Sequence, residues 1–252
     1  MGLRPVPDGM WLEPDRNRDW QLAQKRAALA SDPDRWLLEP QDEATQRGVD
    51  RLAALLTTEL GVEVAPTIAA CGTATQEDWC VMTREDTWRL RAACLCFPSR
   101  WVLAEKVGHP ISTIHEPVPR YEAELGGLVE SFFDRLRGDR IVWRLNWNIW
   151  DDGRLAQPFR EADAPVHDLP APEEVGDRVV LRNERQTLRL LTDDTIAFSI
   201  RVHQRPLSTL VDQPGAIDQL RSILADPTLA EHVPKKIGRL TPPLTAWLAT
   251  QP

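Results

Sequence analysis

Apolar residues between positions 49 and 60 recur with the 3.6-residue period of an amphipathic helix. They are Val49, Leu52, Ala53, Leu56 and Leu60. Gly61 follows them directly and is typical of the residue that ends a helix. Another helix is predicted over 17–31, before the proline-containing stretch 32–34 ends it. Its expected inward face comprises Trp20, Ala23 and Ala27. The two helices are predicted to cover the rest of the molecule.

From Trp79 onward the apolar period changes to two, which is typical of half-buried strands. The pattern predicts a hairpin made of strands over 79–83 and 87–97, with its turn at 84–86. Strict alternation along the second strand places five residues on one apolar face. They are Trp88, Leu90, Ala92, Cys94 and Cys96. Because free cysteine is among the most buried residue types, both thiols are expected in the core.

A further strand is predicted over 140–150, ending at the turn signal Asp151-Asp152-Gly153. Its apolar face carries Ile141, Trp143, Leu145, Trp147 and Ile149. Its other face carries three hydrogen-bonding side chains in a row. They are Arg144, Asn146 and Asn148. Such a row fits either a ligand-binding surface or a solvent-facing side of the sheet.

The last predicted strands form a second hairpin over 178–191 and 195–203. Alternation in its first strand places Arg182, Glu184 and Gln186 on one face, and Asn183, Arg185 and Thr187 on the other. Charge pairing between neighbouring strands would explain this density as well as a binding role would. Helices are also predicted over 121–138 and 216–225, and a surface loop or lid over 156–176.

These elements predict an α+β fold with an antiparallel sheet, because the strands fall largely in hairpins with helices before and between them. The expected organisation is an N-terminal arm and helical cover over 1–70, a core over 71–210, and a C-terminal helix with a proline-rich tail over 211–252. The three parts are expected to form one compact unit. Because GxGxxG, P-loop, GxSxG and HExxH motifs are missing from the sequence, common nucleotide-binding and hydrolase functions lack support.

Composition narrows the classes of partner. The 252-residue chain carries a net charge of −8 without a basic stripe, which argues against nucleic acid. No apolar run approaches the roughly 20 residues of a membrane-spanning helix. The four cysteines form no CxxC pair, which disfavours both a zinc site and a disulfide framework. A reduced, cytoplasmic setting is the expectation from that cysteine usage.

Candidate chemistry concentrates between Gly108 and Tyr121, where two of the five histidines, three prolines and the single tyrosine occur. His109 and His115 have no second histidine or carboxylate at HxH or helical i+4 spacing, which disfavours a metal ion held by protein ligands alone. Haem differs, because the porphyrin supplies four ligands and the protein needs to supply only one axial residue.

Four blocks then occur in order. They are 97–101 with Glu105-Lys106, 114–119 with Tyr121, 144–147, and 182–189 with 198–201. In order and spacing, from about residue 17 to residue 210, the chain resembles the haem-dependent oxidative N-demethylase alpha subunit-like proteins. The resemblance implies a PAS-like fold, in which a curved antiparallel sheet with flanking helices cups haem b.

The same resemblance implies an activity. The haem subunit of such a system removes a methyl group from a small amine, using dioxygen and releasing formaldehyde. Its electrons come from NADPH through FMN and [2Fe–2S] centres on partner subunits. The alternatives are a PAS-type haem sensor or gas-binding module without turnover, and a cofactor-free structural subunit.

Residue by residue, the resemblance implies that His115 is the axial ligand of the haem iron, because it matches the histidine of its block. A thiolate from Cys94 or Cys96 is the competing ligand. Lys106 and Arg185 are expected to pair with the haem propionates. Four residues are expected on the distal side, to bind an ammonium group or hydrogen-bond bound oxygen. They are Tyr121, Arg144, Asn146 and Glu184.

Overall fold

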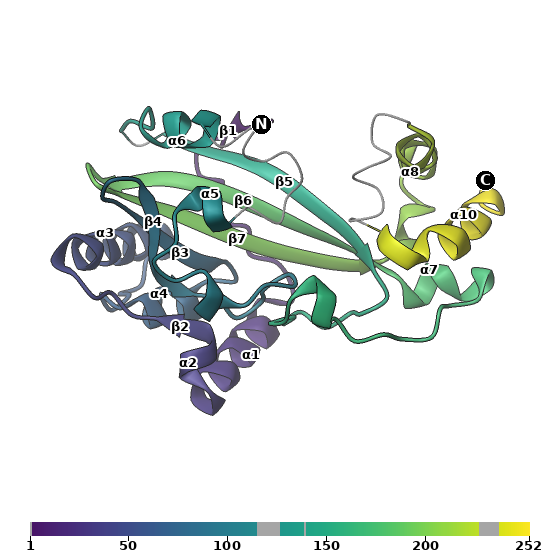
Figure 1. Cartoon of the computed structure of the whole chain (residues 1–252), viewed down its shortest axis with the longest axis horizontal. Helices are drawn as coiled ribbons and strands as arrows, with labels where there is room; N and C mark the ends of the chain where they lie inside the picture. The colour runs from purple at the N-terminus through teal and green to yellow at the C-terminus, as the bar shows by residue number, and fades with distance from the viewer. Residues whose placement is uncertain (1, 115–126, 139, 227–236) are drawn as a thin grey trace. The chain divides into compact units, whose positions relative to one another are not determined.

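The computed structural model describes residues 2–114, 127–138, 140–226 and 237–252. Its strands are β1 (Arg4–Pro5), β2 (Leu37–Leu38), β3 (Asp78–Arg84), β4 (Trp88–Cys94), β5 (Ile141–Trp150), β6 (Val180–Thr192) and β7 (Thr195–Pro206). They form a seven-stranded open sheet in the order β1-β5-β6-β7-β3-β4-β2 (Figure 1). Its antiparallel hairpins β3–β4 and β6–β7 confirm the predicted α+β class.

The helices used below are α1 (Arg18–Ser31), α2 (Pro33–Trp36), α3 (Glu43–Leu60), α4 (Ile68–Ala74), α5 (Ile111–Ile114), α6 (Gly127–Phe133), α7 (Val175–Arg178), α8 (Ala216–Ala225) and α10 (Thr241–Ala249). The strongest sequence prediction is confirmed in α3. The Asp42 side chain accepts a hydrogen bond from the Thr45 backbone N–H at 2.7 Å and caps its start. Gly61 ends it in the left-handed conformation, with φ 67°.

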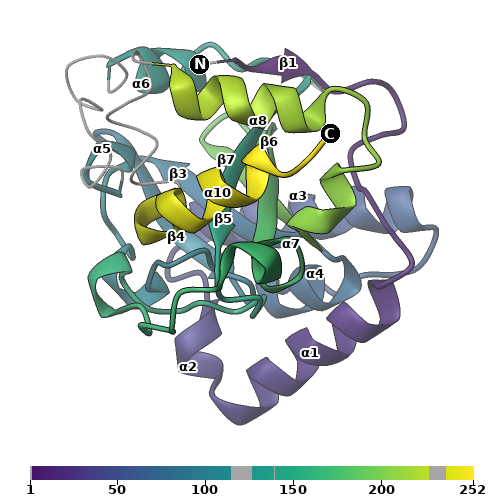
Figure 2. The ribbon, with the colours of Figure 1, turned by 90° about the vertical axis from the view of Figure 1, so that its right-hand side faces the viewer.

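The chain divides into two compact units. The first comprises Met1–Arg144, Ala156–Glu161 and Arg185–Arg201, and the second comprises Leu145–Leu155, Ala162–Glu184 and Val202–Pro252. Within the first unit, α3 and α4 lie on one face of the sheet and α6 lies on the other (Figures 1 and 2). The second unit has its own apolar core, to which α7, α8 and α10 contribute Val175, Ile217 and Trp247.

The register between β3 and β4 shifts by one residue between Val81 and Met82. Val81 lies opposite Ala92, whereas Met82 lies opposite Leu90, so that β4 carries Arg91 as one extra residue. Such a bulge reverses the in–out alternation of side chains beyond it. The prediction that all five apolar residues of this strand share one face is therefore wrong. Alternation in a single sequence does not reveal an extra residue in the pairing.

The two halves of β4 consequently pack against different helices. Trp88 meets Phe133 of α6 edge to face, with ring centroids 5.7 Å apart. Cys94 instead lies against Gly72 of α4, where an added Cβ would stand 2.2 Å from the Cys94 Sγ. Cys94 and Cys96 are both fully buried, which confirms that these thiols belong to the core.

Gly72→Ala is expected to lower the free energy of unfolding by about 1–3 kcal/mol, because the added methyl overpacks the contact between α4 and β4. Urea denaturation measures the change. Gly153→Ala is the matched control, since its Cβ would meet its nearest neighbour, Val180 Cγ1, at an ordinary 3.8 Å. Equal losses in both variants would show that α4 shifts away from β4 at no cost.

The inward face of α1 differs from the predicted one. The residues expected to face the core are exposed, and they are Trp20, Ala23 and Ala27. The buried side chains are instead Gln21, Leu22 and Lys25. Lys25 pairs with Asp78 of β3 at 3.0 Å, and both side chains are 0% exposed. A buried ion pair is invisible to hydrophobic periodicity, because its partner is remote in the sequence.

Candidate functional site

The segment that precedes the predicted haem ligand is attached to the edge of β4. The Gly108 backbone N–H donates to the Leu90 carbonyl at 2.9 Å, and Pro110 forms a β-bridge with Arg89. Gly108 has φ 72°, a conformation that favours glycine, and α5 follows at Ile111. Lys106 is half-buried at the start of this segment, and the His109 side chain is exposed. His115 and Tyr121 lie outside the described residues.

Arg144 lies in the first unit, on the polar face of β5. Its Nε donates to Gln186 Oε1 of β6 at 2.8 Å. Gln186 is 8% exposed and Arg144 is half-buried. The pair is therefore covered, which a plain solvent-facing side of the sheet would not require.

Asn146 and Glu184 form the corresponding pair of the second unit. Asn146 Nδ2 donates to Glu184 Oε2 at 3.1 Å, and Glu184 is only 5% exposed. Asn148, the next polar residue on this face of β5, is 8% exposed. A carboxylate so strongly shielded from water interacts more strongly with a cation than a surface carboxylate does.

Arg185 occupies the opposite face of β6 from Glu184, because successive residues of a strand point to opposite sides. Its guanidinium donates to the backbone carbonyls of Trp11 at 2.8 Å and Met10 at 2.7 Å. It also pairs with the Glu13 carboxylate at 2.9 Å. The structure thus places the Arg185 side chain in contact with the N-terminal arm. Its predicted binding of a haem propionate remains a prediction, and would require the propionate to replace Glu13.

The N-terminal arm is held by a second buried arginine that sequence reasoning missed. Arg201 is 0% exposed, donates from Nε to the Glu13 carbonyl at 3.1 Å, and pairs with Asp15 at 3.0 Å. The Trp11 indole N–H donates to Thr187 Oγ1 at 3.2 Å. The signal available in the sequence was an acidic residue at every second position, Glu13 and Asp15. They form ion pairs with Arg185 of β6 and Arg201 of β7.

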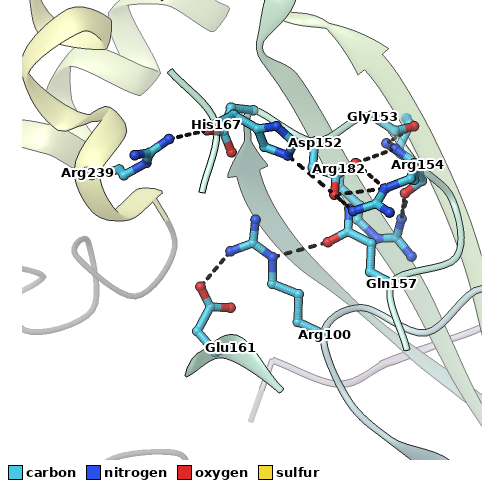
Figure 3. Close-up of polar contacts among 11 residues, drawn as sticks. Arg100, Asp152, Gly153, Arg154, Gln157, Glu161, His167, Arg182 and Arg239 are labelled. Atoms are coloured by element: carbon cyan, nitrogen blue, oxygen red, sulfur yellow. Dashed lines mark hydrogen bonds and ion pairs between the residues drawn. The ribbon is translucent and has the colours of Figure 1, made fainter. Parts of the chain in front are cut away.

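Another group without a predicted role surrounds Arg100, inside the resemblance block 97–101. Its Nε donates to Gln157 Oε1 at 3.1 Å, and its Nη1 donates to Glu161 Oε1 at 2.5 Å (Figure 3). Gln157 is fully buried and Glu161 is exposed. Residues 157 and 161 fall within the predicted surface loop, where sequence pattern offers no signal for a contact with Arg100.

Asp152 anchors a polar cluster in the second unit (Figure 3). Burial raises the pKa of Asp152, but hydrogen bonds from the Arg154 side chain and backbone outweigh that effect and hold the pKa below its ordinary value. His167 Nε2 stands 4.0 Å from the same carboxylate. Over the described ranges, no group of three or more His, Cys, Asp or Glu side chains is arranged to hold a metal ion.

The surroundings of Cys96 disfavour the competing thiolate ligand at that residue. Cys94 and Cys96 have their Sγ atoms 3.9 Å apart. The contact with Cys94, together with burial, raises the pKa of the Cys96 thiol. A thiolate is the form that ligates metal, so a thiol kept protonated is a poor ligand. Both residues are buried core thiols, and Cys94 lies under α4 against Gly72.

The fold and site define a class: an α+β protein whose antiparallel sheet carries covered polar pairs between β5 and β6. A family model described as haem-dependent oxidative N-demethylase, alpha subunit-like, matches residues 45–232. The chain belongs to this family, as the sequence blocks predicted. No protein with a curated description matches the chain. The family description names an alpha subunit, which suggests an assembly with partner subunits. None of the helices in the described ranges is long and apolar enough to cross a membrane.

Proposed function

We propose that this protein is the haem-binding subunit of an oxidative N-demethylase, which removes a methyl group from a small amine with dioxygen. Electrons would come from NADPH through FMN and [2Fe–2S] centres on partner subunits. Family membership supports the haem-dependent class of reaction. The observation that carries the choice of an amine substrate is the hydrogen bond from half-buried Asn146 to the buried carboxylate of Glu184.

We propose that haem would pack on the apolar face of the sheet in the first unit. Register places Met82 beside both Leu90 and Ile196, and all three side chains are buried. These side chains give that face the apolar character that a porphyrin ring requires. His115, the residue after α5 in the sequence, would hold the iron, and Lys106 would pair with a propionate. Haem b, when bound, supplies the activation of dioxygen that oxidising a methyl group requires.

The protein's own residues are proposed to bind and orient the amine. Glu184 pairs with the substrate ammonium, and Asn146 fixes the carboxylate through its amide N–H. Arg144 and Tyr121 donate hydrogen bonds on the distal side. Holding the methyl carbon in one orientation is the main contribution of such groups to rate.

Glu184→Gln is expected to lower kcat/KM for amine-dependent formaldehyde release by roughly 10–100-fold, the loss of one charged hydrogen bond of about 1.5–3 kcal/mol. The assay uses the haem-reconstituted protein with a supplied electron donor, and the Soret band should be unchanged. Glu174→Gln is the matched control, because Glu174 forms an exposed pair with Arg178 at 2.8 Å.

The same experiment separates the alternatives. A wild-type protein with no Soret band after reconstitution would eliminate both haem functions and leave a structural subunit. A normal Soret band without formaldehyde release would indicate a haem sensor. Full activity in Glu184→Gln would remove Glu184 from the substrate site.

A further inference from the structure

We propose that Arg100, oriented by Gln157 and paired with Glu161, forms a carboxylate-binding site in the first unit. Arg100 has φ 58°, and it is the single non-glycine residue with positive φ in the described part of the chain. A non-glycine residue held in this left-handed region costs about 1–3 kcal/mol and persists only where the surroundings impose it. Such strain occurs preferentially at ligand-binding positions.

Backbone hydrogen bonds impose this conformation from both sides. The Gln157 N–H donates to the Pro98 carbonyl at 3.0 Å, and the Arg100 N–H donates to the Gln157 carbonyl at 3.0 Å. Ser99 and Gln157 form a parallel β-bridge between these bonds. The turn at Arg100 is therefore clamped to the segment 156–161 before any side chain contributes.

The guanidinium is fixed as well. The Arg100 side chain is 11% exposed. Gln157, which accepts from its Nε at 3.1 Å, is 0% exposed, so the acceptor cannot swing away (Figure 3). A guanidinium presents a planar fork of donors that matches a carboxylate. Preorganising that fork in a shielded place reduces the entropy lost when a carboxylate binds.

Glu161 already supplies a carboxylate to this fork. Its Oε1 accepts from Arg100 Nη1 at 2.5 Å, yet its side chain is 65% exposed. An ion pair with such an exposed partner contributes at most about 1 kcal/mol. An incoming carboxylate can replace Glu161 without changing the net charge beside Arg100. Glu161 thus acts as an internal stand-in for the ligand.

Two ligands share this chemistry: a haem propionate and the carboxylate of an N-methylated amino acid. Both rest on the proposed function, because both place the site beside bound haem. Arg160 provides the matched control. It pairs with Glu105 at 2.6 Å one residue before Glu161, but its side chain is 64% exposed.

The test compares the wild type, Arg100→Met, Glu161→Gln and Arg160→Met. Soret titrations give the Kd for haem and for haem dimethyl ester, which lacks the propionate charges. Titrations of the ferric haem protein compare N-methylglycine with dimethylamine. If the ligand is a propionate, Arg100→Met weakens haem binding by about tenfold, the effect of one charge-assisted pair, and leaves the ester unchanged. If the ligand is the substrate, only N-methylglycine binding weakens.

Glu161→Gln gives the sharper readout, because it removes the competing carboxylate without touching Arg100. It is expected to tighten the same ligand that Arg100→Met weakens, whereas a purely structural pair would predict no gain. The proposal is overturned if Arg100→Met changes no more than Arg160→Met does, or weakens haem and its ester equally. Should Arg100→Met fail to fold, Glu161→Gln decides by itself, and unchanged affinities for haem and N-methylglycine reject the site.

Failure of the proposed function is a separate outcome. A wild type that takes up no haem refutes that function but still allows the site to be tested. In that case sodium acetate, compared with sodium chloride, is expected to raise the melting temperature of the wild type more than that of Arg100→Met. Equal shifts in the two proteins reject the carboxylate site.

Discussion

Haem-reconstituted His115→Ala is expected to lose the Soret band of the wild type, or to show it strongly shifted, because the iron would lose the one protein ligand proposed for it. The resemblance of the sequence blocks implies His115 as the ligand, and Gly108, seven residues earlier, donates a backbone hydrogen bond to Leu90 of β4. One axial residue is proposed to hold the iron, so we expect no other side chain to bind the iron as strongly. Visible absorption spectra of the ferric and ferrous proteins measure the effect.

His109→Ala is the control for this prediction, because His109 lies six residues earlier and its side chain is exposed. Its spectrum should match that of the wild type. An unchanged spectrum in His115→Ala would eliminate this residue as the ligand. If His109→Ala were the variant to lose the band, the ligand assignment would move to His109.

Lys25→Met is expected to lower the free energy of unfolding by about 3–5 kcal/mol, the range for removing one partner of a buried ion pair. Lys25 also donates to the carbonyls of Gly72 at 3.0 Å and Glu77. Its loss leaves the Asp78 carboxylate charged in a place without water. Asp78 in turn accepts a hydrogen bond from the Phe97 N–H at 2.6 Å. We therefore expect the loss of stability to extend to the start of the block that contains Arg100.

Urea denaturation of two further variants checks the cause of that loss. Arg47→Met removes an exposed pair with Asp194 and is expected to change stability by less than about 1 kcal/mol. Lys25→Met combined with Asp78→Asn is expected to recover part of the lost stability, because the unpaired charge disappears. A loss in Lys25→Met no larger than in Arg47→Met would show that water reaches Asp78 when the pair is broken.

Local pattern predicted most elements correctly where one side of an element is apolar and the other is polar. The helix α3 is the clear case, since its period reports burial against a neighbouring layer. The bounds of β5 were predicted to within one residue, but its apolar face is not buried throughout, because Leu145 is 57% exposed. The polar pairs of β5 with β6 were half predicted. The sequence placed Arg144 and Asn146 on one face, whereas their partners Gln186 and Glu184 follow from strand register.

Site residues were harder to predict when their partners lie far away in the chain. Arg185 meets Glu13 across 172 positions, a contact that no spacing rule suggests. Arg100 lay inside a recognised block, yet its strained φ and its pairing with Gln157 depend on a segment that reads as an ordinary loop. Long-range pairing of charges is set by chain topology, which a single sequence does not display.

The sequence by itself determined the α+β class, the main helix and hairpins, and the family, because periodicity and block order are properties of the chain alone. Only the tertiary structure decided which faces those elements bury. The bulge at Arg91 turned Cys94 away from Trp88, and the pair with Asp78 turned Lys25 of α1 inward. Both outcomes depend on partners brought together by folding, since the register of a strand and the burial of a charge are set by what lies opposite.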